Sequence, residues 1–118
     1  DLNKSQVYAV SRWINKNSVK NVIPENSITK PPSAELKPNQ VDPFDYDIVS
    51  PLVDILITEP ERVHELESEG YPYELVAELM KKVRLAEYKR RQAPPGIRIS
   101  SKAFGFGRRY PIINQFTM

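Results

Sequence analysis

The start of the chain has apolar residues at the spacing of one face of an α-helix. They recur close to the i, i+3, i+4, i+7 pattern and are Leu2, Val7, Val10, Trp13 and Ile14. We predict a helix over residues 3–16, with Asp1 or Asn3 as its N-cap and with Trp13 in the core rather than on a binding surface. Lys4 lies in the first turn, where the helix dipole disfavours a cation unless an anion is nearby. It is therefore either a solvated lysine or a ligand of an anion.

Prolines shape the segment that follows. Residues 27–36 are predicted to be extended or loop, because Pro31 and Pro32 keep the residues before them out of the helical region. Residues 36–46 combine acidic, aromatic and proline residues without a helical period. We expect this part of the chain to be mobile.

The apolar run over residues 48–57 predicts a short buried helix. Ser50 and Pro51 have the residue types of an N-cap and a first helical position, which favours a helix over a strand. Thr58 and Glu61 then form a T-x-x-E capping box.

The capping box predicts a further short helix that stops at Gly70. Its inward positions are Val63 and Leu66. His64 is the single histidine of the chain and has no partner close by in the sequence, so we interpret it as a surface or boundary residue without a catalytic role.

The last predicted helix begins at Pro72 and ends near Gln92, because the prolines at 94–95 cannot continue it. Its inward face consists of Leu75, Val76, Leu79, Met80, Val83 and Ala86. Glu78 and Lys82 form a favourably oriented i, i+4 ion pair on the outer face.

Three consecutive cations, Lys89, Arg90 and Arg91, close this helix. They either complement the negative end of the helix dipole or present a cation cluster to a phosphate or carboxylate. Residues 97–118 have no helical period, and we predict an extended basic tail held by aromatic side chains. These are Phe104, Phe106, Tyr110 and Phe116.

Composition and charge narrow the function classes. The 118 residues contain eleven prolines, four glycines and no cysteine, which excludes zinc–thiolate sites, disulfides and thiol nucleophiles. No apolar run is long enough to cross a bilayer, and no signal-peptide pattern opens the sequence. Residues 1–87 carry ten Lys/Arg and fifteen Asp/Glu, whereas residues 88–118 carry seven Lys/Arg and no acid. Such a basic tail favours an anionic partner.

Three strings together resemble a known family: DLNKSQVY, ITKPPSAEL and EYKRRQAPPGIRISSKAFGFGRRYPI. They are similar, in this order and over essentially the whole chain, to the C-terminal part of the synthetase domain of bacterial glutamine-dependent NAD+ synthetase. The resemblance implies a Rossmann-like α/β domain of the ATP pyrophosphatase type, of which this chain would be a mainly α-helical C-terminal portion. Residues 33–47 would form a mobile active-site loop and residues 97–118 a basic tail.

The resemblance also implies a reaction. ATP adenylylates the nicotinate carboxylate of deamido-NAD, and ammonia, taken from glutamine or free, then attacks the acyl-adenylate to give NAD. The implied cofactors are ATP and Mg²⁺. The implied enzyme is a cytoplasmic homodimer or higher oligomer without a nucleic-acid or membrane partner.

Site residues follow from the same resemblance. Lys4 matches a lysine that contacts ATP phosphate, and Ser33 matches a residue that contacts ATP. Tyr88 and Lys89 match a pair that contacts deamido-NAD. The two arginines that follow, Arg90 and Arg91, are expected to help bind the same anion. We expect no catalytic residue and no metal ligand in this chain.

Two departures from the family pattern limit these expectations. The phosphate-binding SGGxDS loop and the glutaminase domain are absent from the sequence and would lie before Asp1. We therefore expect a fragment that is inactive alone, has mainly helical structure and exposes apolar surface that a parallel sheet would cover. The segment between Asp42 and Pro43 is also shorter than in relatives, which puts a magnesium or loop-closure role of Asp42 in doubt.

A different class of function remains open from the residues alone. Two short helices around residues 70–72, followed by a basic arm, are typical of a helical nucleic-acid-binding module of the helix-turn-helix kind. Glu74 and Glu78 on the outer face of the last helix argue against it, since a recognition helix does not ordinarily present acids to phosphates. A plain protein-interaction module has only the proline content in its favour.

Overall fold

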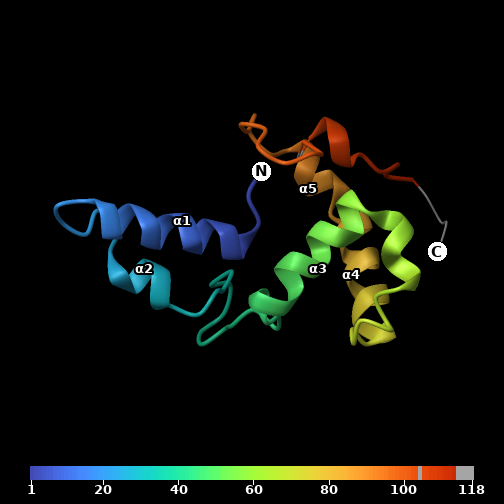
Figure 1. Cartoon of the computed structure of the whole chain (residues 1–118), viewed down its shortest axis with the longest axis horizontal. Coiled ribbons are helices and arrows are strands. Elements are labelled where there is room, and N and C mark those ends of the chain that lie inside the picture. The colour runs from blue at the N-terminus through green and yellow to red at the C-terminus, as the bar shows by residue number, and fades with distance from the viewer. Residues whose placement is uncertain (104, 114–118) are drawn as a thin grey trace. The chain divides into compact units, whose positions relative to one another are not determined.

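A computed structural model of the protein describes residues 1–103 and 105–113, and over these residues its regular structure is helical, without strands (Figure 1). This confirms the prediction of mainly helical structure. None of the described helices is long and apolar enough to span a membrane. The elements are α1 (Lys4–Asn17), α2 (Glu25–Thr29), α3 (Tyr46–Thr58), the 3-10 helix η1 (Pro60–His64), α4 (Tyr73–Leu85), α5 (Glu87–Arg91) and the 3-10 helix η2 (Phe106–Arg108).

The chain forms two compact units. The N-terminal unit is Leu2–Ser50, and the C-terminal unit is Asp1 together with the chain from Pro51 onward, so that α3 begins in the first and continues in the second. Buried apolar side chains of the N-terminal unit are Ile28 and Val49. Those of the C-terminal unit are Leu52, Leu56, Ile57, Leu66, Val76 and Leu79. The C-terminal unit therefore holds the larger core.

Helix α1 begins with a reciprocal capping box at Asn3. The Asn3 side chain accepts a hydrogen bond from the Gln6 amide at 2.9 Å, and the Gln6 side chain accepts one from the Asn3 amide at 3.0 Å. Of the two predicted caps, Asn3 is therefore the correct one. The prediction that Trp13 lies in the core is wrong, because Trp13 is 64% exposed and no residue of α1 is buried. A unit this small has too little apolar surface to cover its longest helix.

The loop predicted over residues 27–36 is wrong in its first residues. Helix α2 covers Glu25–Thr29, buries Ile28 and starts directly after Pro24. Lys30 leaves the helical region, with φ −60° and ψ 131°, as expected for a residue before a proline. From Lys30 to Asp45 the described backbone is irregular, as the sequence indicated.

Helix α3 starts a full turn before the predicted N-cap. Asp45 caps it instead, accepting hydrogen bonds from the Asp47 amide on its carboxylate at 2.9 Å and from the Val49 amide on its carbonyl at 2.8 Å. Ser50 is buried inside the helix, where its hydroxyl oxygen accepts a hydrogen bond from the Ser5 hydroxyl at 3.1 Å. Pro51 lies in the helix interior and leaves the α3 hydrogen-bond ladder one donor short.

The capping box predicted at Thr58 does not form. Thr58 still belongs to α3, and its hydroxyl donates back to the Asp54 carbonyl at 2.7 Å. The helix that follows is the short 3-10 helix η1, which begins without a side-chain cap. His64 is exposed, as predicted.

Gly70 ends the next turn as predicted, through a Schellman motif. Its amide donates to the Glu67 carbonyl at 3.1 Å, and the Tyr71 amide donates to the Leu66 carbonyl at 3.0 Å. Gly70 has φ +96°, a conformation that costs glycine little. The turn places the Leu66 side chain, which has 0% exposure, in the core of the C-terminal unit.

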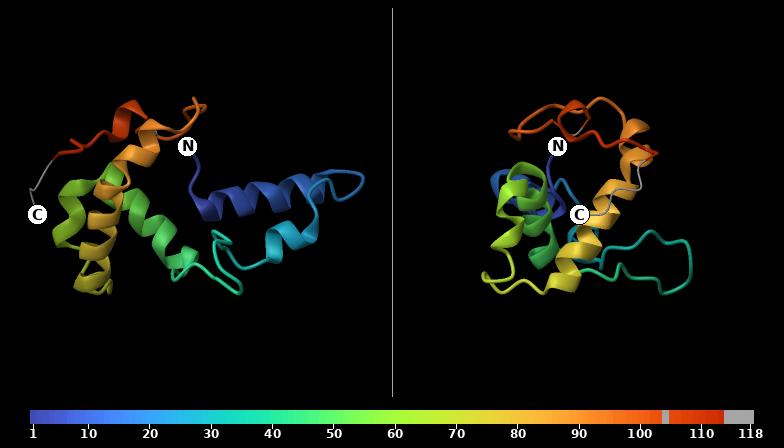
Figure 2. Two further views of the ribbon diagram at one scale, coloured as in Figure 1. Left: turned by 180° about the vertical axis from the view of Figure 1, so that it is seen from behind. Right: turned by 90° about the vertical axis from the view of Figure 1, so that its right-hand side faces the viewer.

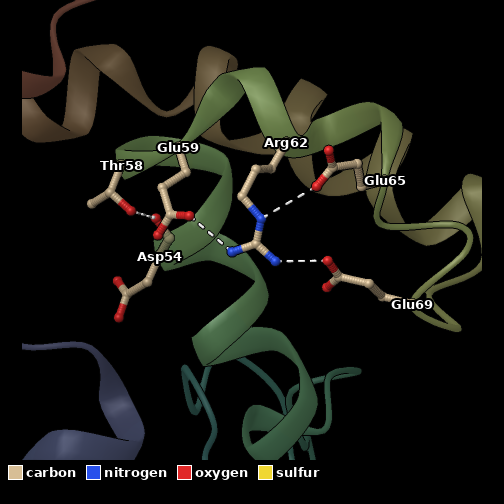
Figure 3. A network of polar contacts seen from close by, with 6 residues as sticks. All are labelled: Asp54, Thr58, Glu59, Arg62, Glu65 and Glu69. Atoms are coloured by element: carbon tan, nitrogen blue, oxygen red, sulfur yellow. Dashed lines mark hydrogen bonds and ion pairs between the residues drawn. The ribbon is translucent and has the colours of Figure 1, made fainter.

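One arginine ties η1 to this turn. Figure 3 shows the Arg62 side chain directed at three carboxylates, those of Glu59 at 2.8 Å, Glu65 at 3.6 Å and Glu69 at 2.6 Å. Hydrogen bonds to Glu59 and Glu69 raise the pKa of Arg62 above its ordinary value. The network adds side-chain links to the backbone hydrogen bonds of this stretch, such as that from the Glu69 amide to the Glu65 carbonyl at 3.1 Å.

The last predicted helix is interrupted. Its inward face is confirmed, since Val76 and Leu79 are buried, and the Glu78–Lys82 pair forms at 3.2 Å. At Ala86, however, the backbone has φ −79° and ψ 4°, and α5 starts anew at Glu87 (Figure 2). The second part ends at Arg91, close to the predicted end at Gln92.

Truncation of Leu66 tests the core of the C-terminal unit. Leu66→Ala is expected to lower the free energy of unfolding by about 2–5 kcal/mol, because it leaves a cavity at a fully buried side chain. Leu85→Ala is the matched control, since Leu85 lies on α4 and is 60% exposed. Urea denaturation followed by circular dichroism measures both variants, and an equal effect of the two would contradict the described core.

Candidate functional site

The predicted site residues fall into two groups in different units. Lys4 and Ser33 belong to the N-terminal unit, and Tyr88, Lys89, Arg90 and Arg91 belong to the C-terminal unit. The structure brings Lys4 close to Asp42 of the irregular segment and to Tyr46 of α3. The four predicted site residues of the C-terminal unit are divided between two faces of α5.

Of the two alternatives for Lys4, a solvated lysine or a lysine beside an anion, the structure shows the second. Lys4 Nζ lies 4.0 Å from Oδ2 of Asp42 and 4.7 Å from the centroid of the Tyr46 ring. The Tyr46 hydroxyl donates to the same Asp42 oxygen at 2.7 Å. We call Lys4, Asp42 and Tyr46 the Asp42 cluster. Lys4 keeps 39% of its side-chain surface exposed, so it remains accessible to a ligand.

The Asp42 cluster also closes the loop that carries Ser33. The Asp42 amide donates to the Pro32 carbonyl at 2.8 Å, which joins the two ends of residues 33–41. Within the loop, the Ser33 hydroxyl oxygen accepts a hydrogen bond from the Glu35 amide at 3.0 Å, and Glu35 also pairs with Lys30. Ser33 is half-buried.

Tyr46 stays protonated over a wide pH range. Burial is the main cause that raises its pKa to about 12, and the hydrogen bond to Asp42 with the negative charge of that carboxylate adds to the effect. The Tyr46 hydroxyl therefore acts as a fixed hydrogen-bond donor to Asp42.

In the C-terminal unit, one buried carboxylate organises α5. Glu87 is 2% exposed and accepts hydrogen bonds from Arg91 Nε at 2.9 Å, from Arg90 Nη2 at 3.1 Å and from the Tyr110 amide at 3.0 Å. These donors come from the same helix face, at i+3 and i+4, and from the tail. We call Glu87 with its three donors the Glu87 cluster.

The Glu87 cluster determines the charge state of the carboxylate. The pKa of Glu87 is lowered to about 2, and the hydrogen bond from Arg91 is the largest cause. Burial acts in the opposite direction, but the three hydrogen bonds, from Arg91, Tyr110 and Arg90, outweigh it. Arg90 and Arg91 both form ion pairs with this carboxylate, so the net charge of the three side chains is +1 rather than +2.

Tyr88 and Lys89 occupy the other side of α5. Tyr88 is 51% exposed, Lys89 is exposed, and Lys89 Nζ lies 6.0 Å from the centroid of the Tyr88 ring. The two predicted deamido-NAD ligands are thus presented to solvent. The Arg90 side chain is nearly buried, at 10% exposure, whereas Arg91 hydrogen bonds to Glu87 and keeps 51% of its side chain exposed.

The described tail is held by polar contacts and by one of the predicted aromatic anchors, Tyr110, whose ring centroid lies 5.7 Å from the guanidinium carbon of Arg90. Phe106 is 82% exposed, whereas Lys102 donates to the Ile57 carbonyl at 2.6 Å and Tyr110 contributes its amide to Glu87. Phe104 and Phe116 lie outside the described residues. The described tail is also not fully extended, since it contains η2.

Sequence reasoning missed Tyr46 and Glu87, and it left a role for Asp42 in doubt. A signal for Glu87 was present, because it is the last acidic residue before the basic tail and precedes two arginines at helical spacing. The helix-turn-helix hypothesis is not supported, because its first helix is a 3-10 helix of five residues. Among the described residues, no group of three His, Asp or Glu side chains could hold a metal ion.

Comparisons with known proteins agree with the family resemblance that the three sequence strings indicated. A family model described as NAD synthase matches residues 1–93. The chain is 39% identical to the glutamine-dependent NAD(+) synthetase of Synechocystis over 98% of the chain and 21% of that protein. It is 41% identical to the corresponding enzyme of Acinetobacter baylyi over 97% of the chain and 22% of that protein.

A solved structure is similar as well. Glutamine-dependent NAD+ synthetase from Acinetobacter baumannii, in complex with adenosine diphosphate, matches 97% of this chain and 20% of its own length, with 33% identity and a TM-score of 0.53. The chain therefore spans about a fifth of the length of the relatives that it matches.

The pH dependence of stability tests the Glu87 cluster. The pKa of Glu87 in the folded state, about 2, lies below its ordinary value of 4.5, so its contribution to stability is complete above pH 4.5 and is lost as the pH falls towards 2. Glu87→Gln, which removes the charge, is expected to flatten this part of the profile and to lower the melting temperature at neutral pH.

Glu61→Gln is the matched control, since Glu61 is an exposed carboxylate of η1. Melting temperatures of the wild type and both variants are compared between pH 2 and 7 by circular dichroism. A Glu87→Gln profile that runs parallel to the wild type would show that this carboxylate does not stabilise the fold.

Proposed function

The chain belongs to the NAD synthase family, and we propose that the whole protein containing it catalyses the ATP-dependent amidation of deamido-NAD to NAD. The observation that supports this most strongly is the similarity to glutamine-dependent NAD(+) synthetases over nearly the full chain. Because the chain spans about a fifth of those enzymes, the proposal is made for the whole protein.

The proposed reaction has two steps. A carboxylate oxygen of the nicotinate group attacks the α-phosphorus of ATP, and pyrophosphate leaves. Ammonia, taken from glutamine or from solution, then attacks the activated carbonyl carbon, and AMP leaves as the amide forms. Cations that bind the departing phosphates lower the barrier of the first step.

In the N-terminal unit, Lys4 and Ser33 are the proposed ligands of ATP. A phosphate would take the place of Asp42 beside the partly exposed Lys4 ammonium. Because Asp42 also closes the loop of residues 33–41, binding at Lys4 would be linked to the position of Ser33. The ADP complex of the A. baumannii relative is consistent with nucleotide binding.

In the C-terminal unit, Tyr88 and Lys89 are the proposed ligands of deamido-NAD. Both are exposed on one side of α5, where a ring and an ammonium group can contact a nucleotide. Arg90 and Arg91 contribute less directly, since both hydrogen bond to Glu87. Their positive charge lies behind the Tyr88 and Lys89 face and favours an anion there.

The proposal includes magnesium as the counter-ion of ATP. The described residues do not supply a carboxylate set for a protein-held ion, and Mg²⁺ commonly binds through substrate phosphates with few protein ligands. A cytoplasmic enzyme that assembles as a homodimer or higher oligomer, without nucleic acid or membrane as partner, completes the proposal.

An activity assay tests the proposed function. The whole protein is expected to form NAD from deamido-NAD only when ATP, Mg²⁺ and either glutamine or ammonium are all present. NAD is measured with a dehydrogenase that does not accept deamido-NAD, and each component is omitted in turn as a control. Absence of NAD with both nitrogen sources would contradict the proposal.

Lys89→Ala in the whole protein tests the deamido-NAD site. We expect kcat/KM for deamido-NAD to fall by about tenfold or more, which corresponds to about 1.4 kcal/mol of lost binding or transition-state stabilisation. The KM for ATP should stay unchanged. Lys81→Ala is the control, since it removes an exposed lysine from α4. An unchanged kcat/KM in Lys89→Ala would remove Lys89 from the site.

A further inference from the structure

Tyr46, the first residue of α3, is the member of the Asp42 cluster to which neither the sequence pattern nor the family resemblance gave a role. Its ring faces the Lys4 ammonium, with Nζ 4.7 Å from the ring centroid, and its hydroxyl donates to Asp42 at 2.7 Å. We propose that Tyr46 is a positioning residue, which holds the Lys4 ammonium in place for a phosphate group. This inference rests on the proposed function, since it takes Lys4 as a ligand of ATP.

The contact between Tyr46 and Lys4 is of the kind that restrains a cation. An ammonium group within about 6 Å of an aromatic centroid is attracted by the negative face of the ring. The Lys4 side chain is 39% exposed and has a long flexible stem, so its ammonium is poorly placed unless a contact restricts it. The Tyr46 ring supplies such a contact.

The ion pair of Lys4 with Asp42 cannot do the same for a bound ligand. Nζ and Oδ2 are 4.0 Å apart, which is longer than the about 2.7–2.9 Å of a direct charged hydrogen bond. In the proposed function, a phosphate also takes the place of this carboxylate. The tyrosine ring is neutral and does not compete with phosphate for the ammonium charge. The contact with the ring can therefore persist when ATP binds, whereas the ion pair is exchanged.

The backbone of Tyr46 is fixed next to Lys4. The Ser5 hydroxyl is shared between the Tyr46 carbonyl at 3.0 Å and the Ser50 hydroxyl at 3.1 Å. Because Ser5 follows Lys4 in the first turn of α1, the turn that carries the ammonium is tied to the residue that carries the ring. This link maintains the separation between the two side chains.

The Tyr46 hydroxyl has a separate task, which is to keep a partner for Asp42. Its pKa is raised to about 12, mainly by burial, so the hydroxyl stays protonated and can donate to the carboxylate whether or not Lys4 is paired with it. Exchange of Asp42 for phosphate beside Lys4 then does not leave the carboxylate without a donor. The effects of the ring and of the hydroxyl can therefore be separated by mutation.

Calorimetric titration of the whole protein with ATP and Mg²⁺ tests the role of the ring. Tyr46→Leu is expected to weaken ATP binding about fivefold or more, within the range of a cation–π contact at a partly exposed site. Tyr46→Phe keeps the ring and should stay within about twofold of the wild type. The hydroxyl that it lacks bonds to Asp42 with and without ATP, so its loss changes both states alike.

Two further variants serve as controls. Tyr73→Leu should leave ATP affinity within about twofold of the wild type, since Tyr73 is the first residue of α4 and is 65% exposed. Tyr46→Met also removes the ring, and its flexible side chain fills irregular space, so it is measured beside Tyr46→Leu in case that variant does not fold. Circular dichroism melting curves show which variants are folded.

A double-mutant cycle separates positioning of Lys4 from a general structural effect. Lys4→Gln alone is expected to weaken ATP binding about tenfold, with the remaining ligands keeping the affinity measurable. If Tyr46 acts through the Lys4 ammonium, adding Tyr46→Leu to Lys4→Gln should cause less than about twofold further loss. A loss from Tyr46→Leu that is equal in both backgrounds would show a structural role and overturn the inference.

The remaining outcomes distinguish this inference from the proposed function. Unchanged ATP affinity in both Tyr46→Leu and Tyr46→Met, or a loss as large in Tyr46→Phe, would overturn the positioning role even in a protein that forms NAD. A protein that forms no NAD but shows the expected losses of ATP affinity would contradict the proposed reaction and support the role of Tyr46. Absence of ATP binding to the wild type would overturn both.

Discussion

The buried carboxylate of Glu87 is the interaction on which the C-terminal unit depends. An ionised carboxylate at 2% exposure is tolerated only if charged and hydrogen-bonded partners replace water. Arg90, Arg91 and the Tyr110 amide supply those partners, so one group fixes both the rotation of α5 and the return of the tail across it. The orientation of α5 then decides which of its cations hydrogen bond to Glu87 and which do not.

A similar division holds in the N-terminal unit. The Asp42 carboxylate accepts a hydrogen bond from the Tyr46 hydroxyl and lies beside Lys4, while the Asp42 backbone amide donates to the Pro32 carbonyl and closes the loop. In both units an acid therefore pairs with cations that the family resemblance associates with anion binding, Lys4 in one unit and Arg90 with Arg91 in the other. The difference is exposure: Lys4 keeps much of its surface, whereas Arg90 is nearly buried. Lys4 can exchange its partner for a phosphate more readily than Arg90 can.

The apolar surface that α1 exposes does not result from a poorly formed helix. Helix α1 is well capped and amphipathic, yet Val7, Val10 and Trp13 remain exposed. The relatives are about five times longer than this chain, and such a stripe is expected where further structure packs on a helix. The core of the C-terminal unit, centred on Leu52 and Leu66, is by contrast internal to the chain.

The sequence by itself determined the approximate positions of the longer helices and the family that the chain resembles. The period of apolar residues located α1 and α4, and a continuous apolar run located α3. Glycine or proline set the ends near Gly70 and Gln92, because these signals act within a few residues. Tertiary structure decided the rest. The exposure of Trp13, the break at Ala86 and the clusters around Asp42 and Glu87 depend on contacts between distant segments, which local propensity does not encode. A carboxylate such as Glu87 looks like any surface acid in the sequence, and only the fold shows that Tyr110, far along the chain, supplies its third donor.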